Sequence, residues 1–180
     1  MALQVTDSLL ARCRLGEIAA QRELFDATAD DVQRIMSRLA FRRDEVDDLV
    51  QDVYLALWRS LASYRGESKF SSFVYGICLN VVRKHRRSWA RFTRLRRSVQ
   101  DEPSPATSTP LDHVADGDRS RAVTRALGRL SFKARTVLVL FEMEGLSGQE
   151  IASQLQIPEK TVWTRLHNAR HAFRRYYKPE

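Results

Sequence analysis

Residues 145–166 read GLSGQEIASQLQIPEKTVWTRL, and this stretch decides how the second half of the chain is expected to fold. Ser147 is followed three positions later by Glu150, which is the spacing of a capping box at the start of a helix. Residues 156–157 form a corner, and Pro158 suits the start of a second helix because its missing N–H would have no partner there. The stretch therefore predicts a helix-turn-helix.

The second helix of this pair is predicted to have two different faces. An apolar face recurs at i, i+4, i+7 and i+11 and is made by Val162, Leu166, Ala169 and Phe173. The opposite face holds hydrogen-bonding side chains and no acid: Lys160, Thr161, Trp163, Thr164, Arg165, His167, Asn168 and His171. A helix that is only solvated more usually pairs Glu with Lys four positions apart. An acid-free face favours DNA, because the second helix of such a motif lies in the major groove.

Basic side chains gather in two zones of this 180-residue chain, whose formal net charge is +8. Residues 83–97 contain eight Lys and Arg and no acid, whereas residues 98–118 contain five acids and no base. Residues 119–180 contain twelve basic and five acidic side chains. Two basic zones separated by an acidic stretch favour contact with a polyanion at two places.

Helical periodicity covers nearly all of the remaining chain, and the alternation typical of strands is absent. The expected helices are 8–15 (capped by Asp7 and ended by Gly16), 17–28 (with Ile18, Leu24 and Phe25 on its inner face), 29–42, 44–64, 69–97, 119–130 and 132–144 (ended by Gly145).

Residues 98–118 contain three prolines and few apolar side chains, which indicates a flexible linker. Fully extended, this segment reaches about 70 Å, or roughly two turns of B-DNA. The sequence thus predicts an all-α protein of two small helical domains, residues 1–97 and 119–180, joined by a flexible linker.

Cysteine usage and hydropathy limit the cellular context. Cys13 and Cys78 have no metal-binding spacing and lie in apolar helical patterns, so we expect buried free thiols in a reducing cytosol. No run of 18 apolar residues exists, and Arg12 and Arg14 interrupt the N-terminal apolar residues, so neither a membrane span nor a signal peptide is expected. A cytoplasmic protein is the expectation.

Three segments together resemble a known family. LSFKARTVLVLFEMEGLSGQEIASQLQIPEKTVWTRLHNAR (130–170) resembles region 4 of bacterial sigma factors of the sigma-70 family. DDLVQDVYLALW (47–58) is similar to region 2.2, and YRGESKFSSFVYGICLNVVRKHRR (64–87) is similar to regions 2.3 and 2.4. The chain has no room for the additional domains of primary sigma factors, so it resembles the extracytoplasmic-function (ECF) group. The resemblance covers about residues 20–175 and implies a region 2 helical bundle and a region 4 helix-turn-helix.

The resemblance implies a contact with the β′ coiled coil of core RNA polymerase through Asp48, Gln51 and Asp52. Their spacing of i, i+3 and i+4 places all three on one helix face. An ordinary solvated acidic face is the alternative.

For the −10 promoter element, the resemblance implies a loop that captures a flipped base and a helix that contacts phosphates. The loop residues are Tyr64, Arg65, Gly66, Glu67, Ser68, Lys69 and Phe70. Asn80 falls where the family has an asparagine facing the loop, and Phe73 replaces a frequent tryptophan. The phosphate contacts fall on Arg83, Lys84, Arg86 and Arg87. Core packing is the alternative role for the three aromatic rings.

For the −35 element, the resemblance implies reading by Lys160, Thr161, Trp163, Thr164, Arg165, His167 and Asn168. Trp163 and Asn168 depart from the family, where a basic residue is more usual at both positions. Asn suits adenine rather than guanine, so we expect an altered preference at the base facing Asn168. Trp163 is expected to contact a thymine methyl or a sugar edge, and packing against the first helix of the pair is the alternative. Ser131 stands where the family usually has proline.

A promoter-recognition subunit of RNA polymerase is the function that the resemblance implies. Its partners would be core polymerase (the β′ coiled coil and the β flap), promoter DNA and an anti-sigma factor, with no catalytic residue, metal, cofactor or direct membrane insertion. A stand-alone helix-turn-helix regulator is a second hypothesis, but it would leave residues 47–58 and 64–70 without a role. A helical protein–protein adaptor is a third, and it predicts no DNA binding.

Overall fold

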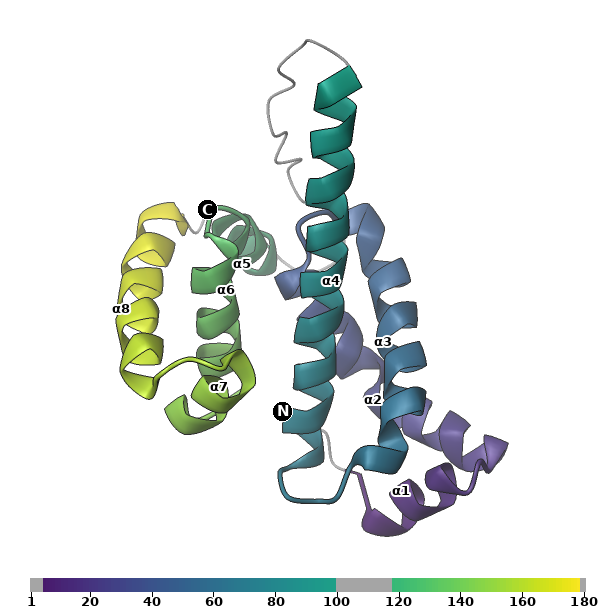
Figure 1. Ribbon diagram of the computed structural model, residues 1–180. Coiled ribbons are helices and arrows are strands. Elements are labelled where there is room, and N and C mark those ends of the chain that lie inside the picture. Colours follow the sequence, from purple (N-terminus) through teal and green to yellow (C-terminus); the bar gives the residue numbers. More distant parts are fainter. Residues whose placement is uncertain (1–4, 100–117, 179–180) are drawn as a thin grey trace.

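The computed structural model describes residues 5–99 and 118–178, and every regular element in these ranges is a helix (Figure 1). The helices form an N-terminal bundle, α1 to α4, and a C-terminal bundle, α5 to α8. This arrangement confirms the expected all-α fold with two small helical parts.

The N-terminal bundle is built around α2, α3 and α4, which all contact one another, and α1 packs on α2. Figure 1 shows that α4 is the longest helix and extends beyond its neighbours. The elements are α1 (Asp7–Arg14), α2 (Ile18–Leu39), the short 3-10 helix η1 (Arg43–Glu45), α3 (Val46–Ser60), the short 3-10 helix η2 (Leu61–Ser63) and α4 (Phe70–Val99). Its core is made mostly of aliphatic side chains, among them Leu24, Ile35, Leu49, Leu57 and Leu79.

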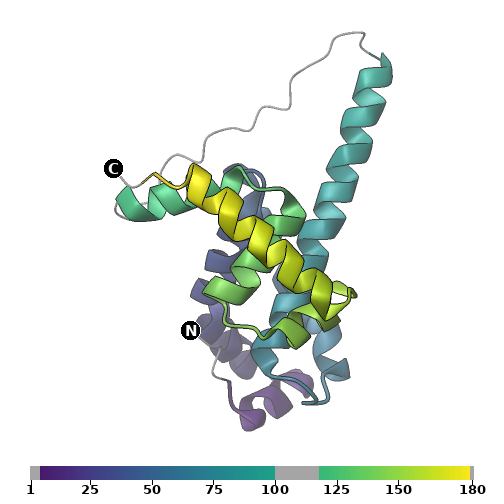
Figure 2. The same ribbon diagram turned by 90° about the vertical axis from the view of Figure 1, so that its left-hand side faces the viewer.

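The C-terminal bundle is smaller, and α8 packs on the other helices of this bundle. Figure 2 shows α8 lying across the front of this bundle when that side faces the viewer. The elements are α5 (Asp118–Gly128), α6 (Phe132–Leu138), the π-helical turn η3 (Val139–Met143), α7 (Gly148–Leu155) and α8 (Glu159–Tyr176). Val162, Leu166 and Ala169 of α8 are buried, as the apolar stripe predicts, and Phe173 is half-buried.

Local capping signals were predicted correctly where the second helix pair begins and turns. The Ser147 hydroxyl accepts the Glu150 backbone N–H, and the Glu150 carboxylate accepts the Ser147 backbone N–H at 2.8 Å, which completes the capping box. These bonds hold the pKa of Glu150 below its ordinary value, and the backbone N–H of Ser147 is the largest cause. Gln156 takes a left-handed conformation at the corner (φ 53°), and Gly145 does so after η3 (φ 72°).

Several expected boundaries were wrong. The segments expected at 17–28 and 29–42 form one helix, α2 (Ile18–Leu39), because no Gly or Pro interrupts them. Thr6, and not Asp7, caps α1 by accepting the Leu9 N–H at 3.3 Å. The segment expected at 44–64 is divided into η1, α3 and η2, and that at 132–144 into α6 and η3. α4 runs two residues past the expected end at 97, and α5 begins one residue earlier than expected. The rest of the expected linker, residues 100–117, lies outside the described residues.

The inner face of α2 was also assigned incorrectly. Ile18 is 81% exposed and Phe25 is 42% exposed, whereas Ala20 and Leu24 are buried. Two residues along a helix correspond to a rotation of about 200°. Ile18 therefore points away from the side on which Ala20 packs. Cys13 and Cys78 are buried free thiols, as expected, and burial raises the pKa of both.

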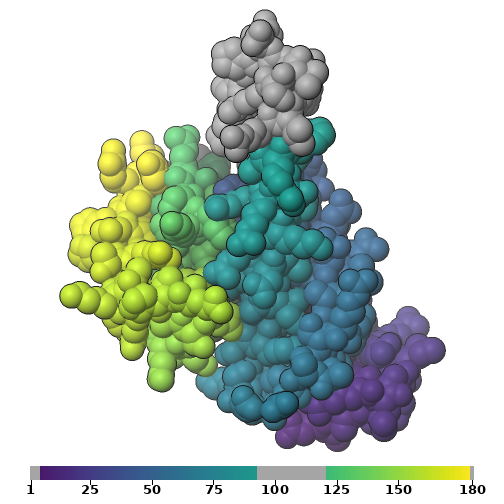
Figure 3. All heavy atoms as spheres, viewed as in Figure 1, coloured from purple at the N-terminus to yellow at the C-terminus, as the bar shows by residue number. Residues whose placement is uncertain are grey.

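Polar side chains join the two bundles. The buried Arg135 donates through Nη1 to the carbonyl of Ala40 at 2.8 Å, and burial lowers its pKa to about 10. Arg38 of α2 forms an ion pair with Glu144 at 2.8 Å. Gln154 of α7 donates to the carbonyl of Ser72 on α4. Figure 3 shows the C-terminal bundle, in green and yellow, lying against α4.

Candidate nucleic-acid interface

An acidic patch lies on the outer face of α3. Asp48, Gln51 and Asp52 are all exposed, while Leu49 and Val53, each the residue after an aspartate, are buried. The structure thus brings the three predicted side chains to one helix face. Leu55 lies three positions after Asp52 on the same face and is 46% exposed. The sequence analysis missed this residue, although its i+3 spacing from Asp52 was a usable signal.

The loop between η2 and α4 presents polar groups on an aromatic base. Residues 65–69 are exposed, and Gly66 takes a left-handed conformation (φ 76°) that glycine allows. The hydroxyl of Tyr64 donates to the carbonyl of Ser68 at 2.6 Å, which closes the loop. The Tyr64 ring lies 4.9 Å from that of Phe73 and 5.5 Å from that of Phe70.

The three aromatic residues have different environments. Phe70 is only 6% exposed and belongs to the core, so the packing alternative describes it. Tyr64 and Phe73 are half-buried against that core. Part of each of these two rings therefore remains accessible beside the polar loop.

One face of α4 carries the predicted polar and basic residues past the loop. Asn80, Lys84 and Arg87 recur at i, i+4 and i+7 and are exposed, and Phe73 lies seven positions before Asn80 on that face. Arg83 is half-buried, and its pKa is lowered first by burial and then by the nearby Arg87. A run of cations with few acids fits a phosphate backbone.

Arg86 is placed differently from the other predicted phosphate contacts. Its guanidinium carbon lies 4.7 Å from the ring centre of Phe132, which belongs to α6 of the C-terminal bundle. It also lies 5.9 Å from the ring centre of Phe41. In this arrangement Arg86 contacts the C-terminal bundle through cation–π interactions.

The outer face of α8 collects the residues predicted to read bases. Lys160, Thr164, His167 and Asn168 are exposed, and Thr161 and Arg165 are half-buried. The Thr164 hydroxyl donates to the carbonyl of Lys160 at 3.0 Å, so this donor is used within the helix. The contacts with the N-terminal bundle come instead from α6, η3 and α7. The outer face of α8 from Lys160 to Asn168 carries no acid and is largely exposed, and exposed Glu159 lies at its start.

Trp163 packs against the first helix of the pair, as the alternative interpretation held. Its ring makes an edge contact with Phe141 at 5.4 Å, and its Nε1 donates to Glu159 at 3.2 Å. A Cβ atom on Gly148 of α7 would lie only 2.5 Å from Cζ2 of the indole, so Trp163 occupies the space that glycine leaves. The side chain is nevertheless 45% exposed.

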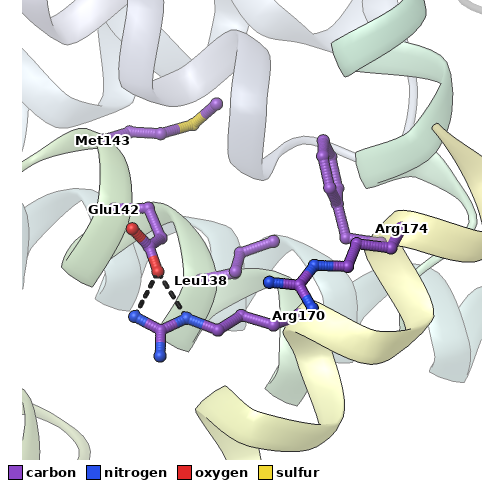
Figure 4. A pocket seen from close by; sticks show the side chains of 6 residues that line it. Leu138, Glu142, Met143, Arg170 and Arg174 are labelled. Atoms are coloured by element: carbon purple, nitrogen blue, oxygen red, sulfur yellow. Dashed lines mark hydrogen bonds and ion pairs between the residues drawn. The ribbon is translucent and has the colours of Figure 1, made fainter.

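A pocket of 280 Å³ lies between η3 and the second half of α8 (Figure 4). Its lining consists of Leu138, Glu142, Met143, Arg170, Phe173 and Arg174. Arg170 donates to Glu142 at 2.6 Å along one edge. The sequence analysis did not identify this pocket, since its walls come from two separate helices.

No group of three or more His, Cys, Asp or Glu side chains in residues 5–99 and 118–178 is arranged to hold a metal ion. Within the same ranges, no helix has the length and apolar character needed to cross a membrane.

Comparison with known proteins gives two family matches. Residues 24–92 match sigma-70 region 2, and residues 120–172 match sigma-70, region 4. The chain is 27% identical to the ECF RNA polymerase sigma-E factor of Haemophilus influenzae, with 99% of each chain covered. It is 28% identical to the sigma-E factor of Escherichia coli K12, covering 99% of this chain and 98% of that protein.

Two solved structures share the fold. CnrH in complex with the cytosolic domain of CnrY has a TM-score of 0.62, with 24% identity and 92% of each chain covered. The sigma factor RpoE of Bartonella quintana in complex with the anti-sigma factor NepR also has a TM-score of 0.62, with 19% identity, covering 86% of this chain and 94% of that one. The two family matches lie in the same order along the chain and together cover more than half of it. With the similarity to ECF sigma-E factors over 99% of the chain, they show that the chain belongs to the sigma-70 family, in its ECF group of RNA polymerase sigma factors.

Proposed function

We propose that this sigma factor binds core RNA polymerase through α3, captures a base of the −10 element with the loop before α4, and reads the −35 element with α8. The observation that carries the proposal is the separation of three exposed surfaces of different chemistry. The α3 surface is acidic, and the loop and α4 surface is polar and basic with aromatic rings. The α8 surface from Lys160 to Asn168 is polar and basic, with exposed Glu159 at its start.

The core-binding surface consists of Asp48, Gln51 and Asp52. Three exposed side chains with hydrogen-bond acceptors on one rigid helix face suit a basic partner surface. Leu55 adds an exposed apolar group beside them. We assign this face to the β′ coiled coil, and the β flap is a second proposed contact on the polymerase.

The −10 surface consists of the loop 64–70 and the exposed face of α4. Flipping a base from a duplex costs a few kcal/mol of stacking, which hydrogen bonds to the base edge and stacking on aromatic rings offset. The loop offers polar groups at residues 65–69 next to the accessible parts of Tyr64 and Phe73. Asn80, Lys84 and Arg87 on α4 then contact the adjacent strand and its phosphates, with Arg83 beside them.

The −35 surface is the outer face of α8, from Lys160 to Asn168. Arg165 and Asn168 have the side chains best suited to base edges, since Arg pairs with guanine and Asn pairs with adenine. Trp163 is fixed by its own domain, and its exposed edge can still contact a thymine methyl or a sugar. An anti-sigma factor is a further proposed partner, because the similar sigma factor RpoE of Bartonella quintana forms a complex with the anti-sigma factor NepR.

In vitro transcription with core polymerase over a library of genomic fragments tests the whole proposal. The wild-type chain should direct specific initiation, and a variant with Asp48→Ala and Asp52→Ala should fail to bind core. Asp47→Ala is the matched control, because Asp47 is a neighbouring exposed acid that instead accepts a hydrogen bond from Gln33. If the protein binds duplex promoter DNA in the absence of core polymerase, and core polymerase does not initiate transcription in its presence, the protein is instead a stand-alone regulator.

A further inference from the structure

Arg14, in the last turn of α1, contacts the loop that precedes α4. Its Nη2 donates to the carbonyl of Tyr64 at 2.6 Å, and its Nε donates to the carbonyl of Leu61 at 3.3 Å. The guanidinium carbon also lies 5.8 Å from the centre of the Tyr64 ring. One side chain thus contacts both the backbone and the ring of the same tyrosine, across 50 positions of sequence.

These contacts fix the backbone at the point where the loop begins after η2. Tyr64 is the cap residue that follows η2, and the carbonyls of residues at a helix C-terminus lack helical partners. A cation there is favourable, and the planar guanidinium fixes two acceptors in one geometry, which a lysine ammonium does not. At its other end Tyr64 donates to Ser68. The tyrosine is therefore held from both sides.

We propose that Arg14 is a positioning residue for base capture: it fixes the Tyr64 ring so that the loop 64–70 keeps the shape that receives the flipped −10 base. This inference rests on the proposed function of the loop. Arg14 acts through Tyr64 and needs no contact with the DNA. It gives α1 a role in promoter melting, although α1 lies outside the residues matched by the family models.

Attachment of α1 to the bundle does not depend on Arg14. Leu9, Leu10 and Cys13 on the same helix are buried, with at most 6% of each exposed. A substitution of Arg14 should therefore leave α1 folded onto α2. Arg12 provides a matched control on the same helix, because it pairs with Glu17 at 2.8 Å and with Glu23 at 3.3 Å instead of with the loop.

The experiment compares holoenzymes on forked DNA taken from a promoter that the wild-type holoenzyme has selected. One fork keeps the flipped base, and a second fork is abasic at that position. Arg14→Ala should weaken binding to the intact fork by about tenfold, the effect expected for losing hydrogen bonds to a charged group. It should change binding to the abasic fork little, and Arg14→Lys should give an intermediate loss. Arg12→Ala should leave both affinities at the wild-type level.

The two levels of the proposal fail in different ways. If the wild-type holoenzyme binds both forks equally, base capture by this loop is wrong. If the wild type distinguishes the forks and Arg14→Ala keeps the full difference, the positioning role alone is overturned. An equal loss on both forks, together with weaker binding to a duplex carrying only the −35 element, would also overturn it, because Arg14 would then act on folding in general.

Discussion

The contact between Gly148 and Trp163 allows a quantitative test of how α7 positions α8. In Gly148→Ala the new Cβ would lie 2.5 Å from Cζ2 and 3.0 Å from Cε2 of the indole, and 2.9 Å from a carboxylate oxygen of Glu159. The indole is rigid, so either the two helices separate or the ring swings into solvent. Overpacking of this kind costs about 1–3 kcal/mol. Alanine gains at most about 1 kcal/mol of helix propensity, so we expect a net loss of roughly 1–2 kcal/mol.

Trp163→Ala removes the ring and the edge contact with Phe141, and we expect a loss of about 1–2 kcal/mol. In the double variant the alanine at position 148 has nothing to clash with. The double variant should therefore lose less stability than the sum of the single variants, with a coupling free energy of roughly 1–2 kcal/mol.

Urea denaturation of the three variants and the wild type gives the four free energies of unfolding. Binding of each holoenzyme to a −35 duplex shows whether the same contact affects DNA recognition. Additive losses within about 0.5 kcal/mol would refute the reasoning, because they would mean that the two residues do not share one space. If Trp163→Ala lowers stability but leaves −35 binding intact, packing is the whole role of the indole.

Three further predictions concern other contacts. Asn168→Arg should change the preferred base at one −35 position in a selected promoter library, and an unchanged preference would contradict the adenine contact. The pKa of Glu150 is lower in the folded state than its ordinary value of 4.5. The ionised carboxylate therefore stabilises the fold at pH values above 4.5, and this stabilisation is lost as the pH falls through the lowered folded-state pKa. Glu150→Gln should therefore reduce the acid-induced drop in Tm, and an equal drop in both proteins would count against the capping box as its source. Arg135→Met should lower the free energy of unfolding, measured by urea denaturation, by about 1–3 kcal/mol, because the carbonyls of Ala40 and Gly128 lose a charged donor. An unchanged urea midpoint would contradict this, because it would mean that the relief from burying the guanidinium offsets both hydrogen bonds.

Features that depend on neighbouring residues were predicted well from the sequence. The capping box at Ser147, the helix end at Gly145, the corner at residues 156–157 and the buried stripe of α8 all follow from short-range geometry. On α3 and in loop residues 65–69 the predicted side chains are exposed, and on α8 they are exposed or half-buried, whereas Phe70 lies in the core.

Features that depend on contacts between distant segments could not be predicted in this way. No residue near Ile18 in the sequence indicates that Ala20, and not Ile18, faces the bundle. The roles of Arg14, Gly148 and Arg86 depend on partners 50, 15 and 46 positions away, namely Tyr64, Trp163 and Phe132. A single sequence carries the identity of each residue but not which distant residue it meets.

The contact between the two bundles affects how easily another molecule can bind to α4. Ser72, on α4, already accepts a hydrogen bond from Gln154 and donates one to Glu150, and both partners belong to the same chain. A tethered partner acts at an effective concentration that reaches the millimolar range for short flexible connections. Any molecule that binds this side of α4 must therefore displace α7, which is present at a high effective concentration because it belongs to the same chain. Its apparent affinity is its intrinsic affinity multiplied by the fraction of molecules in which the site is vacant.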